Sequence, residues 1–323
     1  MDRADIRELA RARRLVTREL YPFNAFYGHA HLLRMYARVT DSSPVKAAIE
    51  HGTTFLPNPI DPDLATHLPR YFCAAAGQAR FFEEHALHGA RAVAIGAPIL
   101  YARALAPLEQ SAPGRRLVFF DAHSSDYATA KYDVAATASR LGELRGDFDD
   151  IVVCLYWRDV LLGRDQLYRD QGFPCVTAGH MFDAQFLFRL LEIILSASIV
   201  LTDQLGSHVA YALALNRPVW LEESRVKYEL AHDAPYGTLG PPKEGEMLDR
   251  AAALLGRQVE RVEPAQQAFA EELCGIENFR TPIEMAELLA EAEAAYRSET
   301  PVWWRLRLEA TAAARRRWNA RPW

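Results

Sequence analysis

One turn of the chain brings together the residue types that bind anions at the start of a helix. The apolar run at residues 198–202 leads to Asp203, and Gly206, Ser207 and His208 come just before an apolar helical stretch. The first N–H groups of a helix and its positive dipole end attract phosphate, and a glycine allows a close approach. His208 can add a hydrogen bond or a charge. Because serine is also a common N-cap, an ordinary turn capped by Ser207 is the alternative interpretation.

A second polar stretch follows the apolar run at residues 117–121. It begins with Asp121 and contains three further side chains that can bind a phosphate or shape a turn, namely His123, Ser124 and Ser125. Lys131, at the end of this loop, could neutralise a phosphate. A turn stabilised by its aspartate and serine side chains is the alternative interpretation.

Arg158 is the third candidate, because it follows the run IVVCLY at residues 151–156. A guanidinium group can bind phosphate oxygens through two parallel hydrogen bonds, which would make Arg158 a diphosphate clamp. A salt bridge to Asp159 or Asp165 is the alternative interpretation.

Strand-like and helix-like stretches alternate around these loops and must position them. The strand-like runs lie at residues 117–121, 151–156, 174–177, 199–202 and 218–221. Helical stretches of roughly 10–13 residues, among them residues 159–171, separate most of them, a rhythm typical of βαβ units and of a parallel sheet. Ligands bind outside the carboxyl ends of such strands. We therefore expect the loops that follow Asp121, Tyr156 and Thr202 to converge on one ligand.

Residues 176–221 resemble the C-terminal half of GT-B-fold glycosyltransferases, in which a strand, loop, helix and strand lead to a Gly-Ser/Thr turn and a further helix. The same architecture also occurs in sugar epimerases. The resemblance implies that three residues lie near the nucleotide base, namely Thr177, Gly179 and His180. It also implies that three lie near the donor phosphates, namely Gly206, Ser207 and His208. Tyr211 and Ala212 stand where many family members carry the acidic residue that binds the sugar.

A fourth candidate lies in the N-terminal region, where the short run VKAAIE ends on His51-Gly52. An apolar run that ends on such a turn is typical of the C-terminal edge of a sheet. The turn resembles the His-Gly of the first domain of capsule and teichoic-acid polymer transferases. The resemblance implies that His51 is the general base on an acceptor hydroxyl, with Glu50 as a second base candidate. A structural histidine is the alternative.

The expected fold class is α/β, with two Rossmann-like domains of GT-B-like architecture and parallel sheets flanked by helices. We expect a smaller N-terminal acceptor-side α/β domain at residues 1–112, with its linker at residues 106–116. A Rossmann-like nucleotide-binding domain follows at residues 113–285, and a C-terminal helical tail at residues 286–323. The first domain is smaller than a full GT-B half, so it is either trimmed or completed by a partner.

Composition narrows the function classes. The chain has 323 residues and a formal net charge of −5, which gives no sign of a nucleic-acid binder. The four cysteines lack CxxC or Cys/His ligand spacing, so we expect reduced thiols and no metal site. The charged first 20 residues lack the apolar core of a secretion signal, and Arg189 and Glu192 interrupt the longest apolar stretch. These features predict a cytoplasmic protein.

The tail at residues 303–323 contains four tryptophans and six arginines. It either folds back on the body as a helix or lies on an anionic inner membrane, as amphipathic Trp/Arg segments do. The second arrangement would suit a lipid-linked acceptor.

Together these features predict a metal-independent glycosyltransferase of surface polysaccharide assembly, such as capsule or lipopolysaccharide. Its partners would be a nucleotide-sugar donor and a glycan or lipid-linked acceptor, and we expect no cofactor. A basic residue such as Arg158 or Lys131 would stabilise the leaving diphosphate in place of a metal. The alternatives are a polyol-phosphate or pyruvyl transferase of similar fold, and a catalytically silent nucleotide-binding or scaffold protein.

Overall fold

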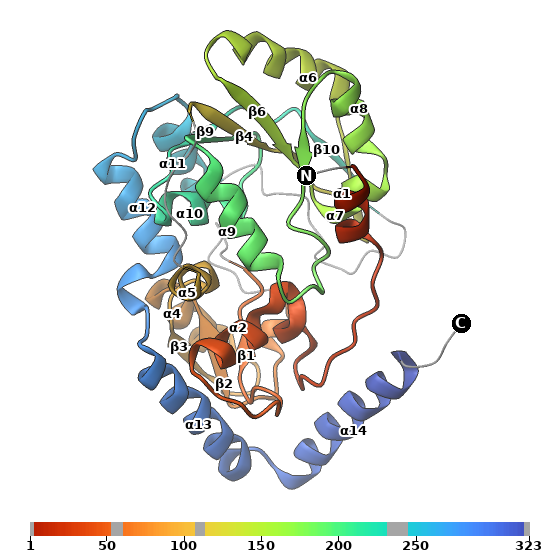
Figure 1. Cartoon of the computed structure of the whole chain (residues 1–323). Helices are drawn as coiled ribbons and strands as arrows, with labels where there is room; N and C mark the ends of the chain where they lie inside the picture. Colours follow the sequence, from red (N-terminus) through yellow and green to blue (C-terminus); the bar gives the residue numbers. More distant parts are fainter. Residues whose placement is uncertain (1–2, 53–60, 107–113, 231–244, 320–323) are drawn as a thin grey trace. The chain divides into compact units, whose positions relative to one another are not determined.

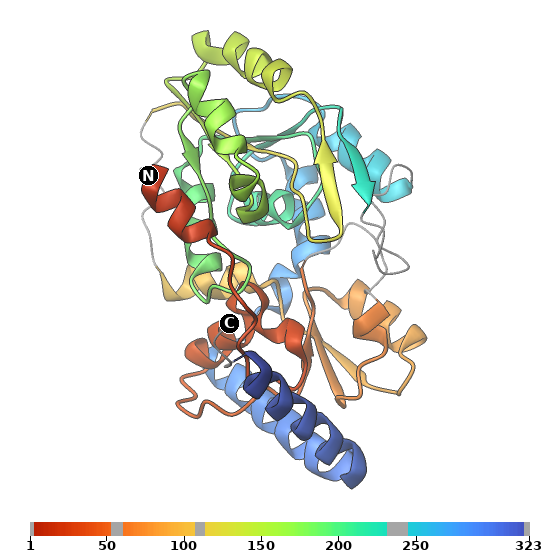
Figure 2. The same cartoon turned by 90° about the vertical axis from the view of Figure 1, so that its right-hand side faces the viewer.

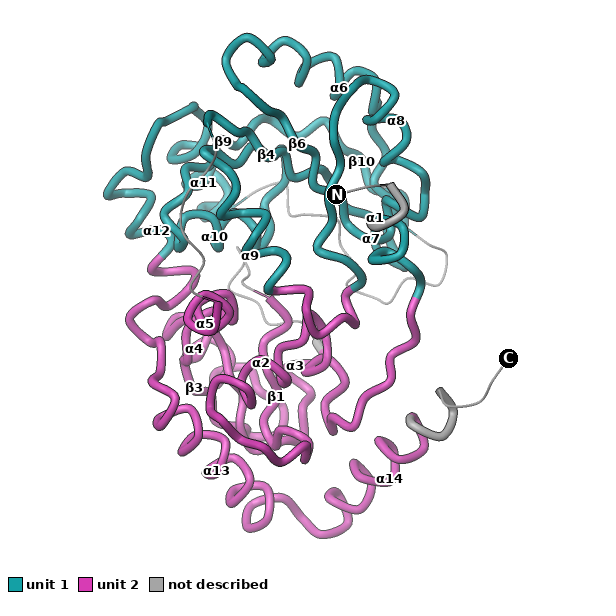
Figure 3. Tube along the Cα trace, viewed as in Figure 1, with its two compact units in different colours: residues 1–12, 107–180, 188–270 teal, residues 13–106, 181–187, 271–323 magenta. Residues whose placement is uncertain are grey.

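The computed structural model describes residues 3–52, 61–106, 114–230 and 245–319 (Figure 1). The chain divides into two compact units, distinguished by colour in Figure 3. Unit 1 comprises residues 1–12, 107–180 and 188–270. Unit 2 comprises residues 13–106, 181–187 and 271–323.

Unit 1 contains a five-stranded sheet in which every neighbouring pair of strands is parallel. The expectation of an α/β fold with parallel sheets is therefore confirmed. The strands read as continuous apolar runs because helices cover both faces of such a sheet. The strands are β4 (Arg116–Phe120), β6 (Asp150–Cys154), β7 (Cys175–Val176), β8 (Ile199–Thr202) and β9 (Val219–Leu221).

The order of the strands across this sheet is β7-β6-β4-β8-β9. The chain moves outward from β4 through β6 to β7, and then returns to the other side of β4 for β8 and β9. The direction of winding therefore reverses between β4 and β8. In open α/β sheets a crevice forms at such a reversal, outside the carboxyl ends of the strands.

Of the residues described, no helix combines the length and the apolar character needed to cross a bilayer.

Helices surround this sheet, and two short ones stand where the sequence predicted a single helix at residues 159–171. That helix is broken at Gly163, whose φ of +82° cannot continue a helix. The helices are α1 (Arg3–Ala10), α6 (Val134–Glu143), η2 (Leu144–Gly146), α7 (Trp157–Leu161), α8 (Arg164–Asp170), α9 (Phe186–Ser196), α10 (Ser207–Ala214), α11 (Glu246–Leu255) and α12 (Pro264–Cys274).

The stretch expected to be a polar loop at residues 123–131 contains a strand. This strand, β5 (Ala128–Lys131), pairs antiparallel with β10 (Lys227–Leu230), and Figure 2 shows the two side by side. The expectation of a loop was wrong here because the partner strand lies almost a hundred positions away. Residues 128–131 alternate between alanine and a polar residue, but the run is short and only weakly apolar.

Unit 2 contains a three-stranded parallel sheet in the order β1-β2-β3. Its core includes Tyr71 and Phe82, whose rings stack with centroids 3.9 Å apart. The strands are β1 (Ala48–Ile49), β2 (Arg70–Cys73) and β3 (Arg91–Ala94). The helices are η1 (Pro22–Gly28), α2 (His29–Tyr36), α3 (Asp61–Leu64), α4 (Ala76–His85), α5 (Pro98–Leu105), η3 (Ile276–Asn278), α13 (Pro282–Glu299) and α14 (Val302–Asn319).

The two units do not follow the expected boundaries at residues 112 and 285. Helix α1 packs on α7 and β7 of unit 1, and the N–H of His180 donates to the Leu9 carbonyl at 2.9 Å. Helix α13 packs on α2 of unit 2, and Arg70 is paired with Glu299 at 2.9 Å. Residues 286–319 therefore group with residues 13–106, which local patterning did not reveal. Most of the expected linker lies outside the described residues.

Candidate functional site

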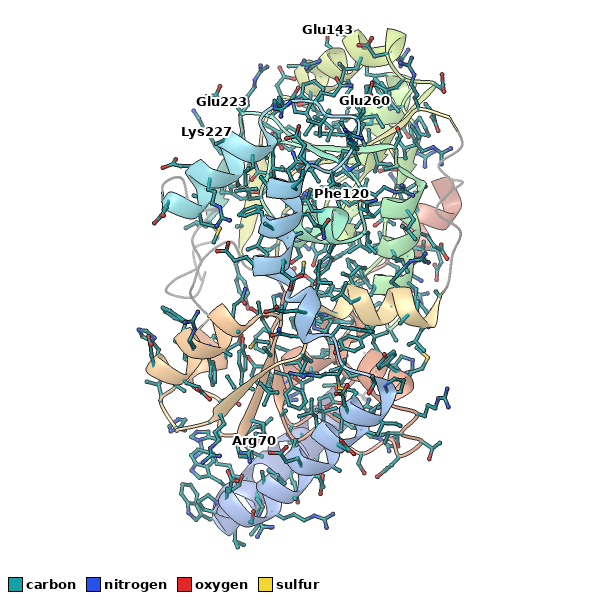
Figure 4. The ribbon with its side chains drawn as sticks, turned by 90° about the vertical axis from the view of Figure 1, so that its left-hand side faces the viewer. Arg70, Phe120, Glu143, Glu223, Lys227 and Glu260 are labelled. Carbon is teal, nitrogen blue, oxygen red and sulfur yellow. The ribbon has the colours of Figure 1, made fainter. Side chains whose placement is uncertain are left out.

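Two polar loops meet at the carboxyl edge of the unit 1 sheet, where its winding reverses. The hydroxyl of Thr202, at the end of β8, donates to the carbonyl of Phe120, at the end of β4, at 3.0 Å. The ring of His208 stacks on Phe120 with centroids 4.8 Å apart, and its Nε2 lies 3.2 Å from the Thr202 hydroxyl. Figure 4 places Phe120 within unit 1. The turn at residues 203–208 thus lies against the end of β4, as the parallel topology predicts.

The N-terminus of α10 is built differently from the sequence expectation. Gly206 is the N-cap, in an extended conformation with φ −164°, and has no side chain with which to cap the helix. Ser207 is already the first helical residue, so the alternative interpretation of Ser207 as the N-cap was wrong. A Cβ at position 206 would lie 3.1 Å from Nδ1 of His208. The glycine therefore leaves room for the His208 ring beside the first turn of the helix.

The pKa values of His208 and His123 are both lowered. Burial, and to a smaller extent the neighbouring His123, lower the pKa of His208 to about 3. Burial also lowers the pKa of His123, an effect that Asp159 opposes. Of the two roles expected for His208, the structure leaves the hydrogen bond and removes the charge.

Two carboxyl groups flank the reversal, one after each strand. Burial raises the pKa of Asp121 to about 7, although the hydrogen bond from Tyr132 opposes the rise. Burial also raises the pKa of Asp203 to about 6. The Oδ1 atom of Asp203 is buried and accepts no hydrogen bond from the described part of the chain. This edge of the sheet therefore holds an acceptor oxygen that lacks a donor.

The serines after β4 shape their own loop. Ser124 is buried, and its hydroxyl accepts the N–H of Ala130 at 3.1 Å. The Ser125 hydroxyl accepts the N–H of Ala128 at 3.0 Å. Both hydroxyls are thus engaged in holding β5 against the loop, in agreement with the turn interpretation. The ring of His123 contacts Tyr156, with centroids 5.2 Å apart.

A buried ion pair that the sequence did not predict holds the loop after β4 in place. Arg164 and Asp159 approach to 2.7 Å, and both side chains are almost fully buried. The other carboxylate oxygen of Asp159 accepts the N–H of Ser124 at 2.9 Å. Arg164 also donates to the carbonyl of Ala130. The break at Gly163 brings Arg164 back towards Asp159. Because the sequence predicted one continuous helix here, it did not predict this ion pair.

The two cations proposed to bind phosphate are each held by a carboxylate at the surface. Lys131 pairs with Glu229 across the β5–β10 ribbon at 2.9 Å. Arg158 pairs with Asp126 at 3.6 Å, rather than with Asp159 or Asp165. All four side chains are at least a third exposed. Exposed pairs of this kind contribute only ~0–1 kcal/mol, so an arriving phosphate could exchange for the carboxylate.

The loop after β7 is closely packed, and the side chains of Thr177 and His180 are buried. The buried hydroxyl of Thr177 accepts the N–H of Gly179 at 3.1 Å. Gly179 has φ +95°, and a Cβ there would lie 2.9 Å from a guanidinium nitrogen of Arg189. The buried ring of His180 packs on Trp157 with centroids 4.1 Å apart. The base-binding role implied for these residues remains a prediction.

In unit 2, Glu50 lies at the carboxyl end of β1 and is buried. One carboxyl oxygen accepts the N–H of Ala74 at 2.8 Å. Burial, and to a smaller extent the nearby Asp63, raise the pKa of Glu50 to about 8, although the Ala74 N–H opposes the rise. Glu50 is therefore protonated at neutral pH and cannot accept a proton there.

His51 follows Glu50 and lies among aromatic rings. The ring centroids of Phe23, Phe26 and Tyr27 lie 5.6, 5.2 and 5.4 Å from that of His51. Burial lowers the pKa of His51 to about 4, so its ring is neutral at neutral pH. Its Nδ1 is buried and has no hydrogen-bond partner among the residues described. A neutral imidazole can accept a proton, although a pKa of about 4 makes it a weak base.

Within the described ranges, no group of three or more His, Cys, Asp or Glu side chains is placed to hold a metal ion. All four cysteines are buried, and none forms a disulfide.

No protein-family model matches the sequence, and no curated protein matches it. A UDP-GlcNAc 2-epimerase from Neisseria meningitidis bound to UDP-GlcNAc resembles the structure with a TM-score of 0.38 and 9% identity. The match covers 70% of this chain but only 61% of the epimerase, which is less than two thirds. S. aureus MnaA, in a co-structure with UDP, matches with a TM-score of 0.42 and 13% identity, covering 79% of this chain and 70% of that one. The parallel α/β architecture itself rests on the strand pairing of this chain.

Proposed function

We propose that the protein is a metal-independent glycosyltransferase that binds a nucleotide-sugar at the carboxyl edge of the unit 1 sheet. It would transfer the sugar to a hydroxyl acceptor in surface polysaccharide synthesis. The position of residues 203–208 carries the proposal, because this turn joins β8 to α10 beside the end of β4, at the reversal of winding. Open α/β sheets bind ligands at that point, and a helix N-terminus there favours phosphate.

The phosphates would interact with groups of three kinds. The first turn of α10 supplies backbone N–H groups and a positive dipole end. His208 supplies a neutral hydrogen-bonding ring beside that turn. Arg158 and Lys131 would leave their exposed carboxylate partners to bind the diphosphate, and so stabilise it as the leaving group.

Asp203 offers a contact for a hydroxyl of the donor. Its Oδ1 is buried and accepts no hydrogen bond within the described chain, and such an atom gains from a hydroxyl donor. A ribose or sugar hydroxyl would satisfy it. Asp203 would then replace the acidic residue that is absent at positions 211 and 212.

The base in this proposal is His51 rather than Glu50. The neutral ring of His51 can take the proton of the acceptor hydroxyl, whereas Glu50 already carries a proton at neutral pH. EDTA should leave the transfer rate unchanged. A rate that EDTA abolishes and Mg²⁺ or Mn²⁺ restores would contradict the metal-independent mechanism.

Calorimetric titration and thermal shift with UDP, CMP, CDP and GDP test the binding step. A nucleotide present at 100 times its Kd should stabilise the folded state by about 2.7 kcal/mol. Asp203→Asn should weaken the binding of a nucleotide-sugar more than that of the bare nucleotide diphosphate. If none of the four nucleotides binds, the transferase proposal fails.

A nucleotide-binding protein without transferase activity is the second candidate. The low basicity of His51 and its packing among Phe23, Phe26 and Tyr27 favour it. Such a protein would bind the donor but neither transfer nor hydrolyse it. A coupled assay for released nucleotide, run with excess donor and a mixture of glycan acceptors, separates the two candidates.

A further inference from the structure

Helix α14 has an inner face that holds it to unit 2. The ring of Trp304 stacks on His67 with centroids 3.5 Å apart. Leu308 and Ala312 pack in the hydrophobic core cluster of unit 2, and Arg315 donates to the carbonyl of Glu19 at 3.2 Å. These residues are spaced by three or four positions and share one side of a helix. The helix is therefore fixed along most of its length, and Figure 3 shows it along the outside of unit 2.

The outer face of α14 consists of Trp303, Leu306, Arg307, Ala310 and Ala314, all exposed. Trp303 is 60% exposed and Leu306 is 62% exposed, and Val302 beside them is 61% exposed. Single exposed apolar residues are common on soluble proteins. Three large ones within five consecutive residues of one rigid helix form a patch that marks an interaction surface.

Positive charge accompanies this apolar patch. Helix α14 contains five arginines and one glutamate, although the whole chain has a formal net charge of −5. Arg307 lies over the ring of Trp304, with its guanidinium carbon 4.9 Å from the ring centroid, and so stands next to the exposed patch. Tryptophan and leucine beside arginine are the side chains that place a helix in the headgroup region of an anionic membrane.

We propose that the outer face of α14 docks on an anionic phospholipid bilayer. Trp303 and Leu306 insert among the headgroups, and Arg307 binds a lipid phosphate. A nucleic acid would satisfy the arginines but would leave the exposed Val302 and Leu306 without an apolar partner. The proposal does not depend on the proposed transferase function.

Vesicle flotation with the full chain tests this docking. The protein should float with vesicles of phosphatidylcholine mixed with phosphatidylglycerol, and should stay behind with vesicles of phosphatidylcholine alone. Because the Debye length shrinks to roughly 3 Å at 1 M salt, high salt should release much of the bound protein. Equal flotation with both kinds of vesicle, or with neither, would overturn the proposal.

Variants localise the contact. The double variant Trp303→Ser, Leu306→Ser should reduce vesicle binding at least tenfold and leave the melting temperature unchanged, since both side chains are exposed. Leu167→Ser removes a leucine that is 50% exposed on α8 of unit 1 and serves as the matched control, which should bind vesicles normally. Arg307→Glu should reduce binding several-fold and weaken its dependence on salt.

Three outcomes would reject the proposal at this stage. The first is undiminished vesicle binding by the double variant. The second is equal loss of binding in Leu167→Ser. The third is self-association of the unaltered protein in size-exclusion chromatography that the double variant abolishes, because the outer face would then join two copies of the chain. Nucleotide titration of the double variant should match that of the unaltered protein, so the two proposals can fail separately.

Discussion

The two parallel sheets both carry a buried carboxyl group at the carboxyl end of a strand, but they differ in strand order and in the hydrogen bonds around that edge. In each unit a carboxyl group follows directly after a strand and is buried, namely Asp121 after β4 and Glu50 after β1. The strands of unit 2 follow one another in chain order across the sheet, whereas those of unit 1 reverse direction between β4 and β8. In open α/β sheets such a reversal is where a crevice forms at the strand ends.

The surroundings of the two edges agree with this difference. In unit 2, Glu50 accepts the N–H of Ala74, and Asp63 accepts the hydroxyls of Tyr21 and Tyr71. In unit 1 the carboxyl group of Asp203 retains a buried oxygen without a donor in the described chain, whereas the buried atom without a partner at the unit 2 edge is a ring nitrogen, Nδ1 of His51. Placing a carboxyl group at a strand end follows from topology, but readiness to bind a ligand depends on which hydrogen bonds the fold already satisfies.

The largest effect that we expect concerns Glu50 and pH. Its carboxyl ionises near pH 4.5 in the unfolded chain but only near pH 8 in the folded protein. Between these values the folded state binds more protons, so the free energy of unfolding falls as pH rises. The contribution of Glu50 is fully present below pH 4.5 and is lost by pH 8, a change on the order of 5 kcal/mol.

Urea denaturation between pH 5 and pH 8 measures this effect. Glu50→Gln keeps an acceptor for the Ala74 N–H and cannot ionise, so its stability should vary less with pH than that of the unaltered protein. The difference between the two proteins isolates Glu50 from Asp63, Asp121 and Asp203, whose raised pKa values act in the same direction. Identical pH profiles would show that Glu50 is ionised in the folded state.

Substitution of two arginines of unit 1 compares a buried ion pair with an exposed one at the carboxyl edge of the sheet. Arg164→Ala leaves the Asp159 carboxylate buried without its cation and should cost about 3–5 kcal/mol. Arg158→Ala breaks only an exposed pair and should cost less than ~1 kcal/mol, while weakening nucleotide binding. Denaturation midpoints and calorimetric Kd values test both variants. Equal loss of stability in the two would mean that the Asp159–Arg164 pair is solvated.

His51→Ala tests whether the edge of unit 2 takes part in catalysis. If His51 is the base, turnover should fall by about a hundredfold or more, and the Kd for the nucleotide should stay unchanged. Steady-state rates and calorimetry on the same preparation give both values. His208→Ala should show the opposite pattern, with weakened binding. Loss of nucleotide binding in His51→Ala would mean that the roles of the two edges are misassigned.

Much of unit 1 could be predicted because buried parallel strands read as uninterrupted apolar runs. The position of Asp121 and Asp203 at one edge followed from that topology. The β5–β10 pairing could not be predicted, because β10 is largely exposed and distant in sequence. The protonation state of the histidines could not be predicted either, since burial by residues distant in the chain sets the pKa of His208. The cap of α10 was missed by one residue, which is within the usual uncertainty of helix ends.

Gly206 allows the smallest test of the contrast between the two edges, because its substitution disturbs the ligand site and little else. Its backbone is extended, so alanine meets no strain there, but the new Cβ would lie 3.1 Å from the His208 ring. We expect Gly206→Ala to displace this ring from the start of α10 and to raise the Kd for the nucleotide about tenfold, which corresponds to about 1.4 kcal/mol. Gly142→Ala, in α6 with open space around the added Cβ, is the matched control and should leave the Kd unchanged. An unchanged Kd for Gly206→Ala would show that the phosphate does not bind at this turn. The proposed difference in ligand binding between the two sheet edges would then lack support.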